Sequence, residues 1–592
     1  MGEALAPRRL QVGREALTPA PLVARVVPDV TGIDRQFDYL VPPQLVGRAR
    51  PGAIVRIDLN GRRVDGWIVA TGDAGTAGFD GFPAEKLSPL LDIAGLGVAE
   101  DIVDLCAWVA QNWAGPLRNV LRSASPDRKR ARAAQPRHGR PSSVDDDVSR
   151  AFRALPSRGG VIDVPPLASA LSAVHAATAL GSVLVVCPTQ RMARLGAAAL
   201  RRRGLTTAEL PDQVDAAVAG VDVVIGARSA VLAGCTGLAA IVVVDEHEES
   251  LHEERVPTWW APEVAVERGR RAGVPVVLTS PCPSARSEML HGPVMRAVER
   301  GGWPTIEVTD LSQVPVRSSL LTEQLLGAVR NSERSTLCIL NTKGSARMLA
   351  CRSCRALQTC PACSAAEALV DGSLVCPVCA NSRVPACGGC GRTALATVRS
   401  GTAKLRDELA ANSRLPVREV TASTVGTGGE AEVYVGTDAL LHRVSSAATV
   451  VFLDIDRDLS APRMSSGREV LASVARASRI VGGAGRIIIQ TRQPAHPLLA
   501  AVVAGDVAGW LRDDTATARS LGLAPFVSVA EISLPEGTDP AVIPDRLGVE
   551  WAEHAGVVLA RAAAHADLLE FVDSVRAAVD GRVRVAVNPP RV

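Results

Sequence analysis

Short apolar segments separated by helix-length sequence dominate the chain beyond residue 148. In the first half of this region they lie at residues 183–186, 221–225, 239–244 and 275–278. Strands buried on both faces of a parallel sheet form such continuous apolar runs, and helical connections separate them. The pattern therefore predicts a parallel α/β domain over residues 149–310.

A second series of strand-length apolar segments follows at residues 337–340, 433–435, 449–453 and 486–490. This series predicts another α/β domain, formed by residues 311–350 and 391–495. The cysteine-rich segment 351–390 interrupts the series. We therefore expect that segment to be an insertion within the second domain rather than a linker between domains.

The N-terminal part of the chain has a different pattern. Short strand-like segments bounded by turn residues lie at residues 22–27, 37–41, 54–57 and 66–69, and they predict a small β domain over residues 21–91. Residues 92–125 have helical periodicity that places Ile102, Leu105, Val109 and Trp113 on one face. We expect this face to be a core stripe.

Three further segments complete the predicted organisation. Residues 1–20 mix Pro, Arg and Gly without periodicity, which is typical of a disordered leader. Residues 126–148 carry basic runs followed by acidic residues, a pattern typical of a solvated linker that could also touch phosphates. Residues 496–592 are helix-rich and then strand-like, and they predict a C-terminal α+β domain.

Composition narrows the class of protein. The chain has 592 residues, of which 47% are hydrophobic and 21% charged, as expected of a multidomain globular protein. We find no apolar run of transmembrane length, so we expect no membrane association and a cytoplasmic location. The net charge of +3 does not by itself indicate nucleic-acid binding. Arginine carries nearly all of the positive charge, because the lysines are Lys86, Lys129, Lys343 and Lys404.

Four C-x-x-C pairs stand within residues 351–390: Cys351/Cys354, Cys360/Cys363, Cys376/Cys379 and Cys387/Cys390. Eight thiolates can form two closed, structural zinc sites with four cysteines each. The alternative of disulfides is disfavoured because no secretory signal precedes the long chain. The connectors of five, twelve and seven residues suit a nested pairing, and spacing leaves a sequential pairing open. The other thiols are expected to be buried side chains: Cys106, Cys187, Cys235, Cys282 and Cys338.

Several short motifs occur in a specific order along the chain. They are F-D-Y at 37–39, G-A-R-S-A at 226–230, L-N-T-K-G at 340–344 leading to the first cysteine pair, G-T at 401–402, V-G-T at 435–437, and I-I-Q-T at 488–491 before H-P at 496–497. In this order the chain, from residue 21 to residue 592, resembles the PriA family of primosomal replication-restart proteins, also called primosomal protein N′. Members of that family are superfamily 2 DNA helicases.

The resemblance implies a multidomain α/β architecture. Its parts would be a 3′-end DNA-binding domain (21–91), a winged helix (92–125), the linker (126–148), two RecA-like lobes (149–310, then 311–350 with 391–495), a two-zinc insertion (351–390) and a C-terminal domain (496–592).

The resemblance also implies site residues. One zinc ion would be held by Cys351, Cys354, Cys387 and Cys390, and the other by Cys360, Cys363, Cys376 and Cys379. A pocket for the terminal 3′ hydroxyl of a nascent strand would include Phe37, Asp38, Tyr39, Gly61 and Lys86. An aromatic ring can stack on a base, a carboxylate can accept from the hydroxyl and a lysine can meet a phosphate. The alternative for F-D-Y is a strand edge with core aromatics.

The motor motifs of the family are degraded. A nucleotide-binding loop needs backbone N–H donors followed by a Lys and a Ser or Thr. The corresponding segment 158–169 has no Lys, and Pro165 and Pro166 remove two donors. No lysine lies between Lys129 and Lys343, so a shift of the motif cannot restore it.

The remaining helicase motifs are altered in the same way. Asp245 and Glu246 follow an apolar strand where a magnesium-binding Asp and a water-activating Glu belong. We interpret them as vestigial, since an acidic run after a strand is also a common signal for the start of a helix. T-S-P-C-P-S at 279–284 and L-H-R at 441–443 replace the family's coupling motifs. In the last motif Arg476 and Arg479 survive as charges that could contact phosphates or acidic neighbours.

These features favour a nucleoid-associated DNA replication protein that promotes replication restart without a helicase activity of its own. It would bind branched or fork DNA with a 3′ end and recruit primosome and helicase-loading proteins, including single-stranded DNA-binding protein. Two Zn²⁺ ions would be its cofactors, ATP with Mg²⁺ is not expected as a cofactor, and the sequence leaves open whether a nucleotide still binds without turnover. One alternative is an active ATP-dependent 3′ to 5′ DNA helicase, and another is a zinc-ribbon interaction module with no DNA role.

Overall fold

The structure is a computed structural model. It describes residues 21–76, 79, 83–125, 135–139, 143–298, 301–312, 320–330, 335–341, 349–362, 365–377, 379–397, 402–420, 432–461, 463 and 465–590. The expected leader (1–20) and most of the expected linker lie outside these ranges. The chain forms two compact units, the first holding the N-terminal sheet and the second holding the two α/β lobes, the cysteine module and the C-terminal sheet.

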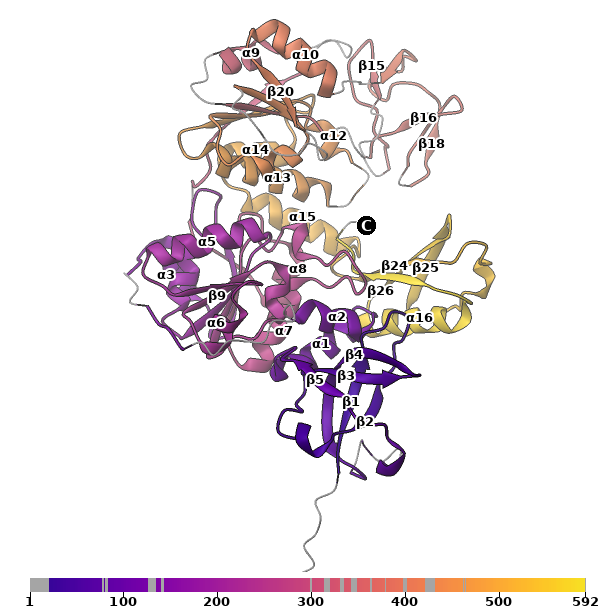
Figure 1. Cartoon of the computed structure of the whole chain (residues 1–592). Helices are drawn as coiled ribbons and strands as arrows, with labels where there is room; N and C mark the ends of the chain where they lie inside the picture. The colour runs from indigo at the N-terminus through magenta and orange to yellow at the C-terminus, as the bar shows by residue number, and fades with distance from the viewer. Residues whose placement is uncertain are drawn as a thin grey trace, which may run out of the picture. The chain divides into compact units, whose positions relative to one another are not determined.

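The N-terminal unit is built on a five-stranded antiparallel sheet (Figure 1). Its strands are β1 (Leu22–Pro28), β2 (Phe37–Leu40), β3 (Ile54–Leu59), β4 (Arg62–Asp73) and β5 (Asp92–Gly95), in the order β2-β1-β4-β3-β5. The predicted β domain is therefore present. Its predicted end at residue 91 is wrong, because β5 pairs with β3 inside the same sheet.

Two helices follow the sheet, α1 (Glu100–Asn112) and α2 (Leu117–Ala124). The predicted stripe of Ile102, Leu105, Val109 and Trp113 is buried, with at most 1% of each residue exposed. Residues 96–125 are all described and contain no strand, so they lack the β-hairpin that gives a winged helix its wing. The predicted helical periodicity is therefore confirmed. The winged-helix assignment for residues 92–125 does not agree with these helices, because no β-hairpin accompanies them.

The first α/β lobe contains a seven-stranded sheet in the order β12-β6-β11-β10-β7-β9-β8, with parallel pairing. The strands are β6 (Gly159–Asp163), β7 (Ser182–Val186), β8 (Thr207–Glu209), β9 (Val223–Gly226), β10 (Leu238–Val243), β11 (Val276–Ser280) and β12 (Val294–Arg296). The helices include α3 (Asp147–Ala154), α4 (Leu171–Ala177), α5 (Gln190–Arg202), α6 (Val214–Ala219), α7 (Ala261–Ala272) and α8 (Ala285–His291). The apolar runs predicted as buried strands are β7, β9, β10 and β11.

The second α/β lobe contains a six-stranded parallel sheet in the order β13-β23-β22-β14-β21-β20. The strands are β13 (Thr305–Asp310), β14 (Thr336–Ile339), β20 (Val417–Val420), β21 (Val433–Gly436), β22 (Thr449–Phe452) and β23 (Arg486–Thr491). The helices include α9 (Glu323–Arg330), α10 (Thr402–Ser413), α11 (Ala439–Arg443), α12 (Asp456–Leu459) and α13 (Ser466–Val481).

Two predicted boundaries of this second lobe are wrong. β13 lies in the second sheet, although residues up to 310 were assigned to the first lobe. Beyond residue 495, α14 (Pro497–Ala504) and α15 (Ala508–Ser520) contribute Leu498, Leu499, Val502 and Leu511 to the second lobe's core. Both errors have one cause: a short amphipathic element does not reveal which of two neighbouring cores its apolar face joins.

The cysteine-rich segment is an insertion, as predicted. It leaves the second lobe after β14 and returns before α10, while β14 itself pairs with β21 and β22. Its described strands are β15 (Leu349–Cys351), β16 (Ala368–Val370), β17 (Ser373–Val375), β18 (Ser382–Arg383) and β19 (Leu395–Thr397). They form a two-stranded and a three-stranded sheet.

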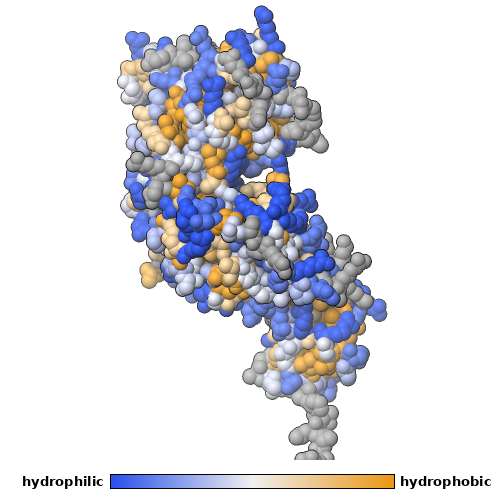
Figure 2. Space-filling view, turned by 90° about the vertical axis from the view of Figure 1, so that its left-hand side faces the viewer, coloured by the Kyte–Doolittle hydropathy of each residue, from blue (hydrophilic) through white to orange (hydrophobic). Residues whose placement is uncertain are grey.

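The C-terminal part has a four-stranded antiparallel sheet in the order β25-β26-β24-β27, with α16 (His565–Ala578) packed against it. The strands are β24 (Ser528–Ser533), β25 (Val549–His554), β26 (Val557–Ala562) and β27 (Arg584–Val587). On the face drawn in Figure 2, hydrophobic residues form separate patches among hydrophilic ones. None of the described helices combines the length and apolarity needed to cross a membrane.

The glycine pair of segment 158–169 lies within β6 rather than in a phosphate loop, and this placement can be tested. Gly159 has φ +92°, and a Cβ there would stand 1.9 Å from the carbonyl oxygen of Val276 on β11. We expect Gly159→Ala to lower the free energy of unfolding by at least about 2 kcal/mol, because both the backbone and the strand contact are strained. The measurement is calorimetric unfolding of the full chain.

Gly327 provides the matched control. It lies in α9, and a Cβ there meets nothing within 4 Å. Gly327→Ala should therefore be neutral or stabilising by up to about 1 kcal/mol. Equal melting of Gly159→Ala and the wild type would contradict the strand placement.

Candidate nucleotide cleft, zinc module and DNA pocket

The loop between β6 and α4 occupies the position where a nucleotide-binding loop would present N–H donors. The backbone N–H groups of residues 164–168 are already used. The N–H of Val164 donates to Ser280 O at 2.8 Å, that of Leu167 to Gly302 O at 3.0 Å and that of Ala168 to Pro165 O at 2.9 Å. Pro165 and Pro166 have no N–H. Residues 164–168 therefore offer no free backbone donor to a phosphate group.

A carboxyl group also ends β6. Asp163 is 8% exposed, and burial raises its pKa to about 7, with Arg296 opposing this rise and Asp506 adding to it. A phosphate bound at this edge of the sheet would meet an acidic side chain instead of a lysine ammonium. Residues 163–168 therefore differ from a phosphate-binding loop in both their charge and their available donors.

The acidic residues after β10 are held by arginines from α13. Arg479 Nη1 and Nη2 donate to the two carboxylate oxygens of Asp245, both at 2.6 Å. Arg476 Nη2 donates to both oxygens of Glu248, at 2.8 and 2.7 Å. Asp245 is 1% exposed, so its charge is compensated within the protein. We call these two ion pairs the interlobe lock, because they join β10 of the first lobe to α13 of the second.

Charge and burial support the lock. Burial opposes ionisation of Glu248, but Arg476, followed by His247, outweighs it and lowers the pKa of Glu248 to about 2. Paired guanidinium and carboxylate groups form strong, geometrically specific contacts. In a working motor, the Asp would bind Mg²⁺ and such arginines would face the γ-phosphate. Here the arginine and carboxylate side chains instead form hydrogen bonds with one another.

Glu246 has a different set of partners. It is fully buried and accepts from Ser284 N at 2.7 Å, from Ser284 Oγ at 2.9 Å and from the hydroxyl of Ser287. These groups belong to the N-terminus of α8, where Ser284 is the N-cap. The helix start that we expected directly after Asp245 and Glu246 is absent from the fully described residues 244–256, which instead contain the short 3-10 helix η4 (Glu249–Leu251).

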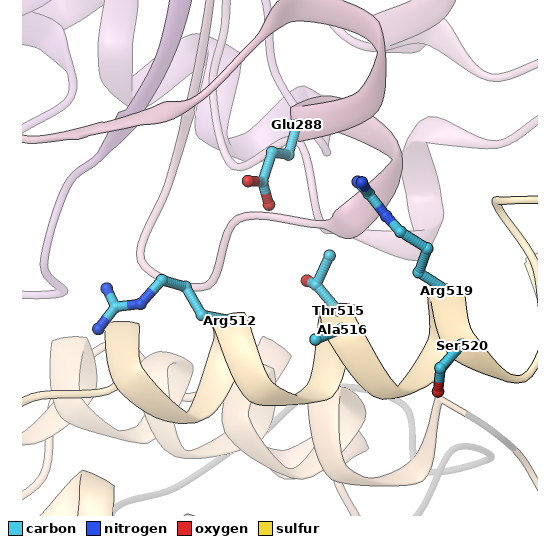
Figure 3. Close-up of a pocket in the computed structure, with 6 residues that line it drawn as sticks. All are labelled: Glu288, Arg512, Thr515, Ala516, Arg519 and Ser520. Atoms are coloured by element: carbon cyan, nitrogen blue, oxygen red, sulfur yellow. The ribbon is translucent and has the colours of Figure 1, made fainter.

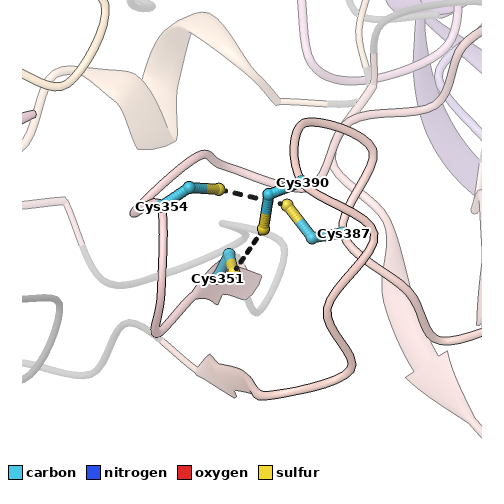
Figure 4. Close-up of side chains that lie close together, drawn as sticks. All are labelled: Cys351, Cys354, Cys387 and Cys390. Atoms are coloured by element: carbon cyan, nitrogen blue, oxygen red, sulfur yellow. Dashed lines mark hydrogen bonds between the residues drawn. The ribbon is translucent and has the colours of Figure 1, made fainter.

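The outer cysteine pairs of the insertion meet in space. The sulfurs of Cys351, Cys354, Cys387 and Cys390 all lie within 4.8 Å of one another, with Cys354 and Cys387 at 3.3 Å and Cys351 and Cys390 at 3.6 Å (Figure 4). A tetrahedral zinc site with Zn–S bonds near 2.3 Å places its sulfurs about 3.8 Å apart. The four side chains therefore fit one metal ion with small adjustments.

A second cluster contains Cys360, Cys376 and Cys379, whose sulfurs also lie within 4.8 Å of one another. Cys363, the predicted fourth ligand, lies outside the described residues. The outer pairs are thus brought together, as are three of the four inner cysteines. This is the nested pairing and not the sequential one.

Hydrogen bonds within the first cluster shift the pKa values of two of its thiols in opposite directions. Burial raises the pKa of Cys387, but the N–H of Gly389 and neighbouring sulfurs outweigh it and lower the pKa to about 6. The N–H of Ala356 acts to lower the pKa of Cys354, yet hydrogen bonds with the sulfurs of Cys387 and Cys390 raise it to about 12. The two sulfurs thus share a proton, which a metal cation would replace.

The remaining thiols are mostly as predicted. Cys106, Cys187, Cys282 and Cys338 are buried, and burial raises the pKa of Cys187 well above its ordinary value and that of Cys338 to about 12. Cys235 is the exception, because it is only partly buried.

Four of the five predicted DNA-contacting residues surround one cavity of about 650 Å³ in the N-terminal sheet. Phe37, Asp38 and Tyr39 come from β2, and Lys86 comes from the short helix η2 (Ala84–Lys86). Gly61 does not line the cavity, but its N–H donates to Asp58 Oδ1 at 2.9 Å in the turn between β3 and β4.

Tyr39 differs from the role that we expected for an aromatic residue. It is 4% exposed, and its hydroxyl donates to Asp58 O at 2.9 Å. Burial, followed by the charge of Asp58, raises its pKa. The core alternative therefore describes the Tyr39 ring, whereas Phe37 is only partly buried.

Sequence reasoning missed Arg25 and Asp58 in this cavity. Arg25 on β1 donates to both carboxylate oxygens of Asp38, at 2.8 and 2.9 Å, across the paired strands β1 and β2. The pairing places Arg25 directly opposite Asp38. Register cannot be read from either segment alone, so no local signal could have identified this arginine.

Another hollow, of about 330 Å³, lies between Glu288 on α8 and Arg512, Thr515 and Arg519 on α15 (Figure 3). Arg512 and Arg519 are exposed, and the Arg519 guanidinium lies 4.7 Å from the centre of the Phe526 ring. The hollow contains no group of metal ligands among its described residues, and we assign it no role.

The chain is similar to known proteins in two respects. Residues 25–126 match the family model of a PriA 3′ DNA-binding domain, abbreviated 3′BD. Over 88% of each protein, the chain is 26% identical to the probable replication restart protein PriA of Mycobacterium tuberculosis. It is 28% identical to the replication restart protein PriA of Treponema pallidum, over 52% of this chain and 51% of that protein.

Solved structures show only a weak likeness. The DUF1998 helicase MrfA bound to DNA is 12% identical and covers 64% of this chain and 56% of its own, with a TM-score of 0.34. Dbp5 of S. cerevisiae bound to RNA and ADP BeF3 is 10% identical and covers 71% of this chain and 92% of its own, with a TM-score of 0.35. Scores of this size support no functional inference.

The N-terminal domain model and the curated relatives agree with one another. Both indicate the family that the order of sequence motifs resembles. Residues 25–126 thus match the PriA 3′ DNA-binding domain, and over 88% of its length the chain is similar to replication restart proteins named PriA.

Proposed function

We propose that this protein acts in replication restart by binding abandoned or stalled forks through a 3′ end, without ATP-driven unwinding. The match of residues 25–126 to a 3′ DNA-binding domain supports the DNA part of this proposal, as do the names of the curated relatives. The observation that carries the rest is the interlobe lock, since Arg479 holds Asp245 where a motor would hold magnesium.

The DNA pocket would read the terminal nucleotide by complementary chemistry. The Asp38 carboxylate is fixed by Arg25 and would accept a hydrogen bond from the 3′ hydroxyl. Phe37 would stack on the terminal base, and Lys86 would meet a backbone phosphate. Gly61 would support the pocket indirectly by keeping Asp58 in place.

The cysteine module would hold two Zn²⁺ ions and act as a rigid platform. Closed four-cysteine sites order the loops around them and take no part in catalysis. We propose that this platform recruits primosome proteins, helicase-loading proteins and single-stranded DNA-binding protein in a nucleoid-associated, cytoplasmic setting. Cys363 would complete the second site.

The proposal predicts no DNA-stimulated ATP turnover. Purified protein with fork DNA should release phosphate from ATP at the rate of the buffer control, because residues 164–168 offer no phosphate cradle and Asp245 is bound by Arg479. The measurement is a coupled phosphate-release assay, repeated with Asp245→Asn. A clear rate that Asp245→Asn abolishes would support the helicase alternative instead.

The DNA pocket generates a second prediction. Asp38→Asn should weaken binding to a fork with a free 3′ hydroxyl by about 10-fold or more, because a hydrogen bond to a charged group contributes about 1.5–3 kcal/mol. Binding to a fork whose 3′ end carries a phosphate should already be weak in the wild type. Fluorescence anisotropy at fixed salt concentration measures both.

Asp104→Asn is the matched control, because Asp104 is an exposed carboxylate on α1 away from the cavity lining. This variant should bind both forks as the wild type does. The 3′-end assignment fails if the wild type binds free and blocked ends equally. The zinc-ribbon alternative without a DNA role gains support if fork binding is absent altogether.

A further inference from the structure

Three polar side chains of the cysteine module, two of them buried, form a connected group beside its sulfur clusters. Glu367 is fully buried, Gln358 is 2% exposed, and the Arg383 side chain is 22% exposed. Burying a carboxylate, an amide and a guanidinium in so small a module is costly unless each is paired. Their partners therefore indicate what they do.

Arg383 is fixed by a fork of hydrogen bonds. Its Nε donates to Glu367 Oε1 at 2.8 Å and to Oε2 at 3.1 Å, and its Nη2 also donates to Glu367. Nη1 donates to Ala386 O at 2.6 Å, one residue before the ligand Cys387. Nη2 reaches Gln358 Oε1 at 3.4 Å.

Gln358 connects this pair to the first cluster. Its Nε2 donates to the sulfur of Cys387 at 3.4 Å, and its Oε1 accepts from the N–H of Gly388 at 3.1 Å. A side chain that donates to a ligating sulfur and accepts from the adjacent amide fixes the orientation of that ligand.

The strand that carries Arg383 reaches the second cluster. Asn381 immediately precedes β18, and its Nδ2 donates to the sulfur of Cys360 at 3.7 Å. The Asn381 carbonyl accepts from the N–H of Cys376 at 2.9 Å. Arg383 thus lies on a continuous path of contacts from Cys387 to Cys360.

Electrostatics also favours a cation between the two sulfur clusters. A zinc ion with four thiolates carries a net negative charge, so two such sites in one module repel each other. A cation between them reduces that repulsion. Arg383 can supply this cation, because its Nη1 contacts the residue before Cys387 and its strand neighbour Asn381 contacts Cys360.

We propose that Arg383, oriented by Glu367 and Gln358, is a positioning residue that couples the two zinc sites, so that the module binds and releases its ions together. This inference rests on the two-zinc assignment under the proposed function. It goes further by naming the side chains that make the two sites interdependent.

The test follows metal release from the full-length protein with a chromogenic chelator, after metal content has been measured by mass spectrometry. The wild type should hold two zinc ions and release both in one kinetic phase. Arg383→Met removes the cation and the fork but keeps a long apolar side chain. It should release the ions in two phases, the first at least about 10-fold faster than wild-type release, as is typical when residues that orient metal ligands are changed.

Two further variants keep the result decisive. Arg392→Met is the matched control, because Arg392 lies in the same module and its exposed side chain donates to Ser353 Oγ at 3.4 Å. It should release zinc as the wild type does. Glu367→Gln keeps the shape of the carboxylate but weakens its hold on Arg383, and it should fall between the wild type and Arg383→Met.

Co²⁺ substitution provides a readout that does not depend on release kinetics. The thiolate-to-metal absorbance of the wild type should rise in one cooperative step as Co²⁺ is added, and that of Arg383→Met in two. If Arg383→Met purifies without metal, the release kinetics of Glu367→Gln are used instead. Release of zinc from Glu367→Gln in one phase at the wild-type rate would overturn the coupling. Wild-type behaviour of Arg383→Met also overturns it, whereas a wild type holding fewer than two ions overturns the zinc assignment itself.

Discussion

The ion pairs between α13 and the end of β10 determine how this structure can work. Arg479 and Asp245, with Arg476 and Glu248, join the two α/β lobes directly. In a nucleotide-driven motor the same positions would be bridged by a triphosphate and its metal, and loss of that bridge would separate the lobes. Here the bridge is made of side chains and cannot be hydrolysed. Under the proposed function, the lobe arrangement would therefore be independent of a nucleotide cycle.

The free energy needed to break these ion pairs also disfavours nucleotide binding. Removing one partner from a fully buried ion pair costs about 3–5 kcal/mol, and the cost is smaller here because the Arg479 and Arg476 side chains are 30% and 18% exposed. A nucleotide that entered the cleft would have to displace two such pairs and would find no lysine and no free donor in residues 164–168. Each ~1.4 kcal/mol spent on displacing these ion pairs would weaken the binding of a nucleotide about 10-fold. The lock and the degraded loop thus act in the same direction.

The sequence predicted those parts of the structure that depend on local pattern. Apolar runs identified the buried strands of both lobes, the position of the cysteine pairs identified the insertion, and the absence of lysine identified the degraded loop. It did not predict contacts between distant segments. Arg479 and Asp245 are separated by 234 residues, and Arg25 meets Asp38 only through strand register. The assignment of β13 and α14 to the second lobe was missed for the same reason, since a short apolar face does not reveal its partner.

The central claim is that the interlobe lock takes the place of a bound nucleotide. Isothermal titration of the full-length protein with a non-hydrolysable ATP analogue and Mg²⁺ tests it most directly, with and without fork DNA. The account predicts no saturable heat at millimolar analogue. A one-to-one binding isotherm that Asp245→Asn abolishes would contradict it.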